Sequence, residues 1–221
     1  VEETLNANLL TALKRTRDLE ASYRSVAHFF KNTEESKVKN LTIVNAELSQ
    51  LTDLDNTLFI DHIADELKHN FDRLDLRRNY SLLVVPGYLG STAVLDKWAK
   101  IAHDNKALLI TDFQNLESPE DVVDMFSSSD HTGGEVYKSN TIMTCNWLLG
   151  RAKVDVAGEE EHLYVAPSAA LAGRIYSTKM SQVVAGKKFG GINEVESVHF
   201  DLKKSEISEL ERMGLVPMVN E

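Results

Sequence analysis

Cysteine is almost absent from this chain, since Cys145 is the only one among 221 residues. An internal disulfide is therefore excluded, and this usage is typical of a reducing compartment. Apolar runs are short, and none approaches the ~20 residues that a membrane-spanning helix needs. Basic residues are also few: 24 Lys and Arg against 34 Asp and Glu give a net charge of −10. An acidic surface repels phosphate backbones and anionic lipids, so we expect neither nucleic acid nor membrane among the partners.

Recognisable metal and phosphate motifs are also missing. His62, Glu66 and His69 have a spacing that suits a metal, but they lie opposite an apolar helix stripe and are more simply a solvated face. Gly186–Lys188 resembles part of a phosphate-binding loop. Ser181, however, replaces the first glycine of that motif, and a lysine replaces the Ser or Thr that binds magnesium. We expect no cofactor at either place.

A hydrolase would need a nucleophile beside a base. His103-Asp104 at a helix end offers a base for Cys145 or Ser168, but nothing like Gly-x-Ser-x-Gly surrounds either nucleophile. Cys145 lies in an apolar run, where a buried and inert thiol is usual. The other histidines considered have no partner at a useful spacing: His131, His162 and His199. We therefore expect no catalytic residue.

The clearest organisation lies between Tyr80 and Phe113. Ser81–Val85 is a short apolar run that suits a strand buried on both faces, and Pro86-Gly87 should end it, because proline cannot continue a strand ladder. A helix follows whose apolar stripe comprises Val94, Leu95, Trp98, Ile101 and Ala102. Ala107–Ile110 is a second strand. The three elements predict a parallel, right-handed βαβ unit, which we place at the centre of a sheet.

The remaining segments should add elements around this unit. Further helices are predicted over residues 4–31, Thr57–Leu74, Pro167–Val184 and Lys203–Met213, with another starting at Ser118-Pro119-Glu120-Asp121. Further strands are predicted over Val38–Val44, Val195–Phe200 and Leu215–Val219, while Ile142–Leu149 suits either type. One face of the helix predicted over Pro167–Val184 has small side chains, which permit close approach of another element: Ala169, Ala172 and Gly173.

These elements predict an α/β fold with an α+β tendency. It has a central mixed sheet containing the βαβ unit, helices on both faces and an N-terminal helical segment. Residues 1–36 would form that segment and residues 37–221 the α/β domain. At 221 residues the chain needs no disulfide or metal to be stable. It begins without Met and stops directly after a strand-like run, so we expect a fragment of a longer protein.

Four stretches resemble motifs of one known family, in that family's order. Leu19-Glu20-Ala21-Ser22-Tyr23-Arg24-Ser25 resembles Leu-Glu-Gly-x-Trp-Arg-Gly, with Tyr23 at the Trp position. Tyr80–Ile110, with Pro119 and Asp121 after it, resembles a strand, a helix, a strand and an Asn-Pro-x-Asp helix start. Glu209–Met218, which contains Gly214 and Pro217, is close to Glu-Leu-x-x-Leu-Gly-Phe-Ile-Pro-Leu. Leu163–Ile175, with Arg174 after its alanines, adds a weaker match.

Together these stretches are similar to the large subunit of the contractile sheath of bacterial type VI secretion systems, the TssC or VipB family. The departures from the motifs suggest a divergent, Bacteroidetes-type branch. The resemblance implies a cytoplasmic structural protein without an active site. In the family this subunit pairs with a small sheath subunit (TssB or VipA-like), and the pairs stack into a helical tube around an inner tube. Contraction of the tube propels the inner tube.

The resemblance also implies further contacts through regions outside this chain. The family's N-terminal segment, which a disassembly ATPase grips, would precede Val1, and the portion that faces the inner tube and completes strand exchange between neighbours would follow Glu221. Within the chain we expect partner contacts at an edge strand and at an acidic loop. These are Leu215, Val216, Pro217 and Met218, and Glu159, Glu160 and Glu161.

Two other interpretations stay open. The first is an α/β enzyme or nucleotide-binding protein that uses the Gly87–Ser91 loop, because this loop joins a buried strand to a helix. The triple-glycine spacing of dinucleotide-binding loops is missing there. The second is a generic adaptor with an acidic face.

Overall fold

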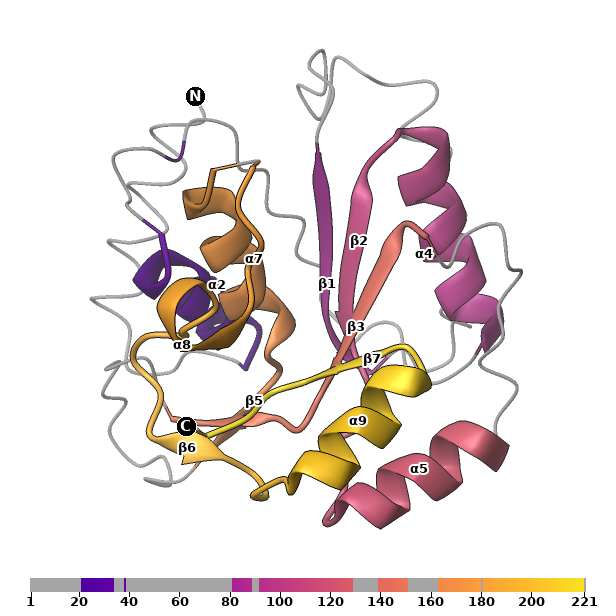
Figure 1. The fold of residues 1–221 in the computed structure, drawn as a ribbon. Coiled ribbons are helices and arrows are strands. Elements are labelled where there is room, and N and C mark those ends of the chain that lie inside the picture. The colour runs from indigo at the N-terminus through magenta and orange to yellow at the C-terminus, as the bar shows by residue number, and fades with distance from the viewer. Residues whose placement is uncertain are drawn as a thin grey trace.

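Figure 1 shows a computed structural model of the protein, which describes residues 21–33, 38, 81–88, 92–128, 139–150, 163–179 and 181–220. Its helices are α2 (Ala21–Lys31), α4 (Thr92–Asp104), α5 (Pro119–Ser128), α7 (Ser168–Ser177), α8 (Gly186–Phe189) and α9 (Lys204–Arg212). Its strands are β1 (Leu82–Tyr88), β2 (Leu108–Asp112), β3 (Thr141–Cys145), β4 (Leu148–Leu149), β5 (Tyr164–Val165), β6 (Ser197–Val198) and β7 (Leu215–Pro217). The predicted α/β class is confirmed. The helix predicted over Thr57–Leu74 and nearly all of the strand predicted over Val38–Val44 lie outside the described residues.

The described strands form two sheets. The larger one has the order β1-β2-β3-β7 with every pairing parallel, and a smaller antiparallel sheet has the order β5-β4-β6. We expected one central mixed sheet. This detail of the prediction is wrong for the described strands, because the parallel pairings lie in one sheet and the antiparallel pairings in the other. The chain leaves the parallel sheet at Asn146, whose φ of 65° turns it toward β4. Within the described residues β2 and β3 are interior strands, whereas β1 has only β2 as a neighbour.

The strands of the large sheet alternate between two apolar layers. Val84, Ile110 and Ile142 pack with α2 and α7 on one face. Leu83, Leu109 and Met143 pack with α4 on the other face. Because side chains alternate along a strand, one short apolar run supplies both layers. Figure 1 shows α7 and α4 on opposite sides of the sheet, with α5 and α9 together near β7. The prediction of a doubly covered sheet is confirmed.

Strand β1 does not end at Pro86. It continues to Tyr88, and its register with β2 shifts between Val85 and Tyr88. Gly87 has a φ of 99°, a conformation that favours glycine, and the exposed Pro86 is accommodated at this irregularity. The prediction that Pro86 terminates the strand was wrong, because a proline is tolerated at a bulge.

A buried carboxylate joins three elements where β2 ends. Asp112 is fully buried, and its Oδ1 accepts hydrogen bonds from Thr144 Oγ1 on β3 (2.5 Å) and from Ser168 N (2.8 Å). Its Oδ2 accepts from Gly87 N on β1 (2.9 Å) and from Ser168 Oγ (2.5 Å). Pro167, the N-cap residue of α7, makes no capping hydrogen bond with its own side chain. Asp112, from a distant part of the chain, caps the first turn of α7 instead.

Burial disfavours the ionised form of the Asp112 carboxyl. Desolvation raises the pKa of Asp112 above its ordinary value, and the hydrogen bonds from Ser168, Thr144 and Gly87 offset part of that rise. Both hydroxyl partners can donate or accept, whereas the backbone N–H groups of Gly87 and Ser168 can only donate. Each carboxyl oxygen must therefore accept one backbone hydrogen bond in either protonation state.

Helix α2 approaches α7 very closely. A Cβ built on Gly173 would lie 2.3 Å from the carbonyl oxygen of Phe29. The small-sided face predicted for this helix is confirmed, although the helix ends at Ser177 rather than at Val184. Asn32, just beyond α2, completes the joint: its side chain bonds the backbone of His28 and of Asn193.

Replacing Asp112 by Asn should destabilise the fold by about 1–3 kcal/mol, the usual cost of an unpaired buried polar group. In either rotamer, the amide NH2 would face a backbone N–H that already donates to that position. Denaturant unfolding of D112N and wild type measures the free-energy difference. Asp124→Asn, an exposed matched control, should leave stability unchanged. Equal stabilities of D112N and wild type would contradict this account of the junction.

Replacing Gly173 by Ala should also destabilise the protein, by roughly 1–3 kcal/mol, because the backbone of α2 would have to move. On an unhindered helix the same change would be favourable. Thermal unfolding checks this prediction. The control is Ser205→Ala, at an exposed position on α9. A raised melting temperature for G173A would mean that the two helices are not in backbone contact.

Candidate functional site

Strand β7 forms the C-terminal edge of the large sheet. Helix α9 ends at Arg212, and Gly214, with a φ of 91°, turns the chain back into β7. The strand pairs with β3 through Met143↔Leu215, Thr144↔Val216 and Cys145↔Pro217. No strand lies beyond β7 in the described part of the chain. Among the described strands β7 therefore lies at an edge, as predicted, although it ends at Pro217 rather than at Val219.

The backbone of β7 explains how proline fits there. Met218 N donates to Cys145 O at 3.0 Å, so this N–H faces β3. Because successive N–H groups point in opposite directions along a strand, the nitrogen of Pro217 faces the open edge. The ring therefore removes a donor that β3 does not use. The open edge still offers backbone groups on both sides of Pro217.

The four residues predicted to contact a partner differ in exposure. Val216 is 38% exposed, and Pro217 is partly exposed. Leu215 and Met218 are only 2% and 9% exposed, because their side chains enter the core. Neither side chain is therefore available to a partner, and the backbone N–H and carbonyl of Met218 are already bonded to Cys145 and Asn146. Val219, which follows them, is 40% exposed and extends the apolar surface of this edge.

Asn146 fixes the end of β7 and was missed by the sequence reasoning. Its Nδ2 donates to the carbonyl oxygens of Met218 (2.7 Å) and Phe200 (2.8 Å), and its Oδ1 accepts from Phe200 N (3.1 Å). The residue is 2% exposed. Its positive φ is one that Asn tolerates better than most residues. An Asn directly after an apolar run was the available signal, but its partners lie 54 and 72 residues away.

The candidate nucleophiles are both buried. Ser168 Oγ donates to Asp112, and Cys145 has no exposed surface. Burial raises the pKa of the Cys145 thiol to about 12, so the thiolate is scarcely populated at neutral pH. The expectation of a buried thiol is confirmed. His103 lies on the exposed end of α4, 3.6 Å from Asp104.

His199 has partners that its spacing did not predict. Its Nδ1 lies 2.8 Å from Asn115 Oδ1, its Nε2 lies 3.4 Å from Glu117 Oε2, and its ring centre lies 4.1 Å from that of Tyr164. The sequence spacing around His199 indicated no partner, whereas the fold brings the end of β2 beside β6. These contacts tie the 113–118 loop to the small sheet.

Other candidate groups are only partly described. Among the described residues no group of His, Cys, Asp and Glu could hold a metal. His62, Glu66, His69, His131 and His162 lie outside those residues, as do Gly90, Ser91 and the predicted loop Glu159, Glu160 and Glu161. Gly87 N already donates to Asp112, so this N–H is not available to an anion. Gly186–Lys188 forms the start of α8.

The motif residues that are described have structural positions. Pro119 opens α5, and Ser118 Oγ both accepts from Asp121 N (3.2 Å) and donates to Asp121 Oδ2 (2.7 Å). The predicted N-cap is thereby confirmed. Arg174 Nε donates to Phe189 O and joins α7 to α8. Tyr23 and Arg24 belong to α2, while Leu19 and Glu20 lie outside the described residues.

Replacing Asn146 by Gly should cost about 2 kcal/mol, since Gly keeps the positive φ but deletes the side-chain hydrogen bonds. Hydrogen exchange adds a local readout: the Phe200 amide should exchange faster in N146G. Asn220→Gly at the exposed C-terminal end is the matched control. Unchanged exchange at Phe200 would show that Asn146 does not anchor this segment.

The described helices include none long and apolar enough to cross a membrane. No curated protein matches the chain. A family model described as the central domain of type VI secretion system TssC/VipB matches residues 11–221, which is nearly the whole chain. Together with the edge strand and the motif positions above, this match establishes that the chain belongs to the TssC/VipB family of type VI secretion sheath large subunits.

Proposed function

We propose that this protein assembles with a small, TssB-like sheath subunit into a helical tube that contracts around an inner tube. The family match supports a structural role in the sheath. The observation that supports assembly through this chain is the outer edge of β7, which is unpaired among the described strands and where Val216 and Val219 are both exposed. A strand from a neighbouring subunit would add there by backbone hydrogen bonds.

The proposed role needs a rigid body rather than reactive groups. Asp112 and Asn146, two deeply buried polar side chains among the described residues, are engaged in hydrogen bonds that hold the strand ends together. We propose that the protein is not an enzyme and acts in the bacterial cytoplasm. Contacts with the inner tube and with a disassembly ATPase would use regions outside this chain.

Co-expression of the full-length protein with its small sheath subunit tests this function. We expect tubes visible by negative-stain electron microscopy. Persistent monomers would overturn the proposal.

A variant directs the same test to the β7 edge. The alternation that turns Met218 N–H toward β3 turns Val219 N–H toward the open edge. Val219→Pro should therefore reduce tube formation without disturbing the pairing of β7 with β3. Val219→Ala, which keeps the N–H, is the matched control and should assemble like wild type. Normal tubes from V219P would place strand addition elsewhere.

A further inference from the structure

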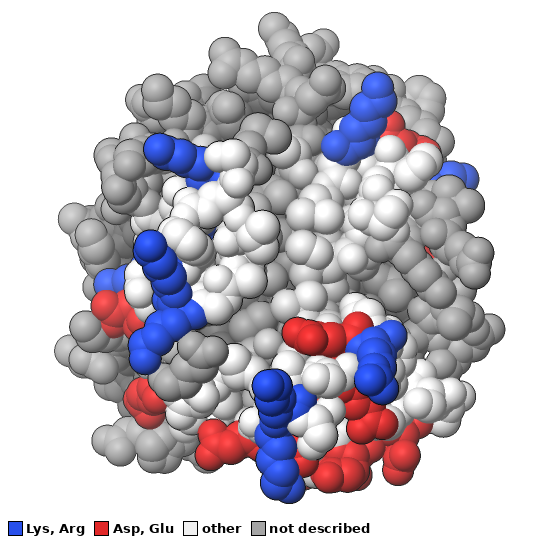
Figure 2. All heavy atoms as spheres, viewed as in Figure 1, with Lys and Arg blue, Asp and Glu red and all other residues white. Residues whose placement is uncertain are grey.

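One part of this acidic chain has a positive net charge because it lacks acids. Between Glu161 and Glu194 the sequence has no Asp or Glu but contains Arg174, Lys179, Lys187 and Lys188. Figure 2 shows blue side chains on the side of the molecule where α7 and α8 lie. Lys179, Lys187 and Lys188 are exposed. We call these four residues, with Val183 and Phe189, the basic patch.

The basic patch also has apolar surface. Val183 is 76% exposed, the highest value among the large hydrophobic side chains that are described as exposed, and Phe189 is 38% exposed. Lys188 Nζ lies 5.1 Å from the centre of the Phe189 ring, within cation–π range. The hydrogen bond from Arg174 Nε to Phe189 O (3.1 Å) holds α8 against α7. The patch is therefore an ordered surface with both charge and apolar area, which is typical of a protein contact.

Negative charge is concentrated around α5 and α9. Figure 2 shows most red side chains on the part of the molecule where Figure 1 places these helices. The exposed acids there, which we call the acidic face, are Glu117, Glu120, Asp121, Asp124, Asp201, Glu209 and Glu211. Lys203, Lys204 and Arg212 lie among them, so acids outnumber bases on this face.

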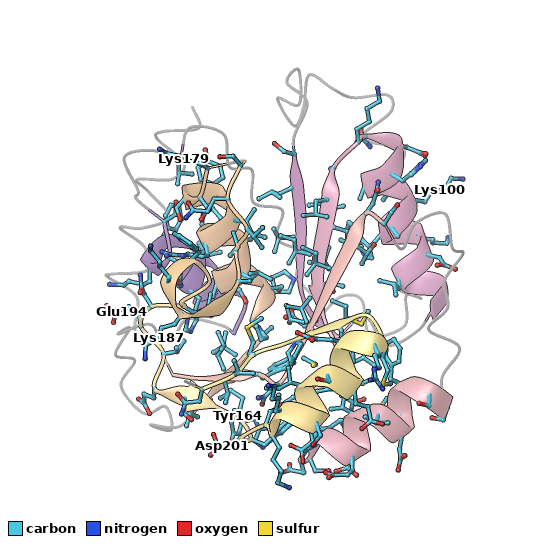
Figure 3. The ribbon with its side chains drawn as sticks, viewed as in Figure 1. Lys100, Tyr164, Lys179, Lys187, Glu194 and Asp201 are labelled. Carbon is cyan, nitrogen blue, oxygen red and sulfur yellow. The ribbon has the colours of Figure 1, made fainter. Side chains whose placement is uncertain are left out.

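The two surfaces lie apart on one molecule. In Figure 3, Lys179 and Lys187 lie on the α7–α8 side, where the acid Glu194 lies beside Lys187, and Asp201 lies at the start of α9. The basic patch and the acidic face therefore cannot neutralise each other within one chain. Contact between them joins two copies through different surfaces, and such a contact repeats into rings or open helical arrays.

We propose that the basic patch of one copy docks on the acidic face of a second copy in the assembled sheath. The inference rests on the proposed sheath function and names the surfaces that large subunits present to each other. Exposed ion pairs each contribute about 0–1 kcal/mol. The charges therefore set the orientation and speed of encounter, while Val183 and Phe189 supply apolar contact.

A charge-swap experiment tests the pairing in the full-length protein co-expressed with the small sheath subunit. Lys187→Glu with Lys188→Glu, and separately Glu120→Lys with Asp124→Lys, should each reduce sedimentable tubes by roughly tenfold, equivalent to about 1.4 kcal/mol. Combining the four substitutions should restore tubes. Lys100→Glu with Lys106→Glu is the control: it makes the same charge change at the end of α4 and should leave tubes unchanged.

Co-purification of the small subunit separates the possible outcomes. Retained small subunit, with tubes lost in each double variant and restored in the combination, supports the proposal. Normal tubes from either double variant, or no restoration, overturn it while the sheath function stands. Loss of the small subunit from the K187E/K188E variant also overturns it and assigns the patch to the small subunit instead. Absence of tubes from wild type overturns the sheath function itself.

Discussion

The carboxylate of Asp112 links strands β1 and β3 and the start of helix α7 at one buried point. Parallel strands end at the same edge of a sheet, and the chain leaves the sheet there. Backbone groups at such exits need partners, because an unpaired buried group costs about 1–3 kcal/mol. The carboxylate of Asp112 supplies them for two backbone N–H groups, those of Gly87 and Ser168, and also binds the Thr144 hydroxyl. Helix α7 in turn places Gly173 against Phe29 of α2. The position of α2 therefore depends on the hydrogen bonds around Asp112.

Asn146 has a comparable role one strand further along the sheet. It turns the chain out of β3 and binds the backbone at Phe200 and Met218, which fixes the end of β7. The edge strand is consequently anchored by the buried side chains of Leu215 and Met218 and by its pairing with β3. Its other side is open among the described residues. A rigid edge of this kind would lose little conformational entropy of its own if another strand paired with it.

The distribution of charge complements this edge. The protein is acidic as a whole, with a net charge of −10, yet one stretch of its sequence carries only basic residues among its charged side chains. Because α7 and α8 lie away from α5 and α9, the stretch without acids and most of the exposed acids lie on different parts of the surface. Surface ion pairs are screened by salt and individually weak. Such surfaces suit contacts that form and rearrange between rigid subunits.

The sequence by itself determined the α/β class, the parallel unit around β2, the Ser118 cap and the edge position of β7, because each depends on local periodicity or on one proline or capping residue. It also carried the family motifs that the TssC/VipB match bears out. Only the tertiary structure decided that β1 continues past Pro86 and that antiparallel strands form a separate sheet. It alone gave Asp112, Asn146 and His199 their partners, which lie 25 to 84 residues away in the chain. Local patterns do not encode such pairings, since they depend on how the strands are ordered in space.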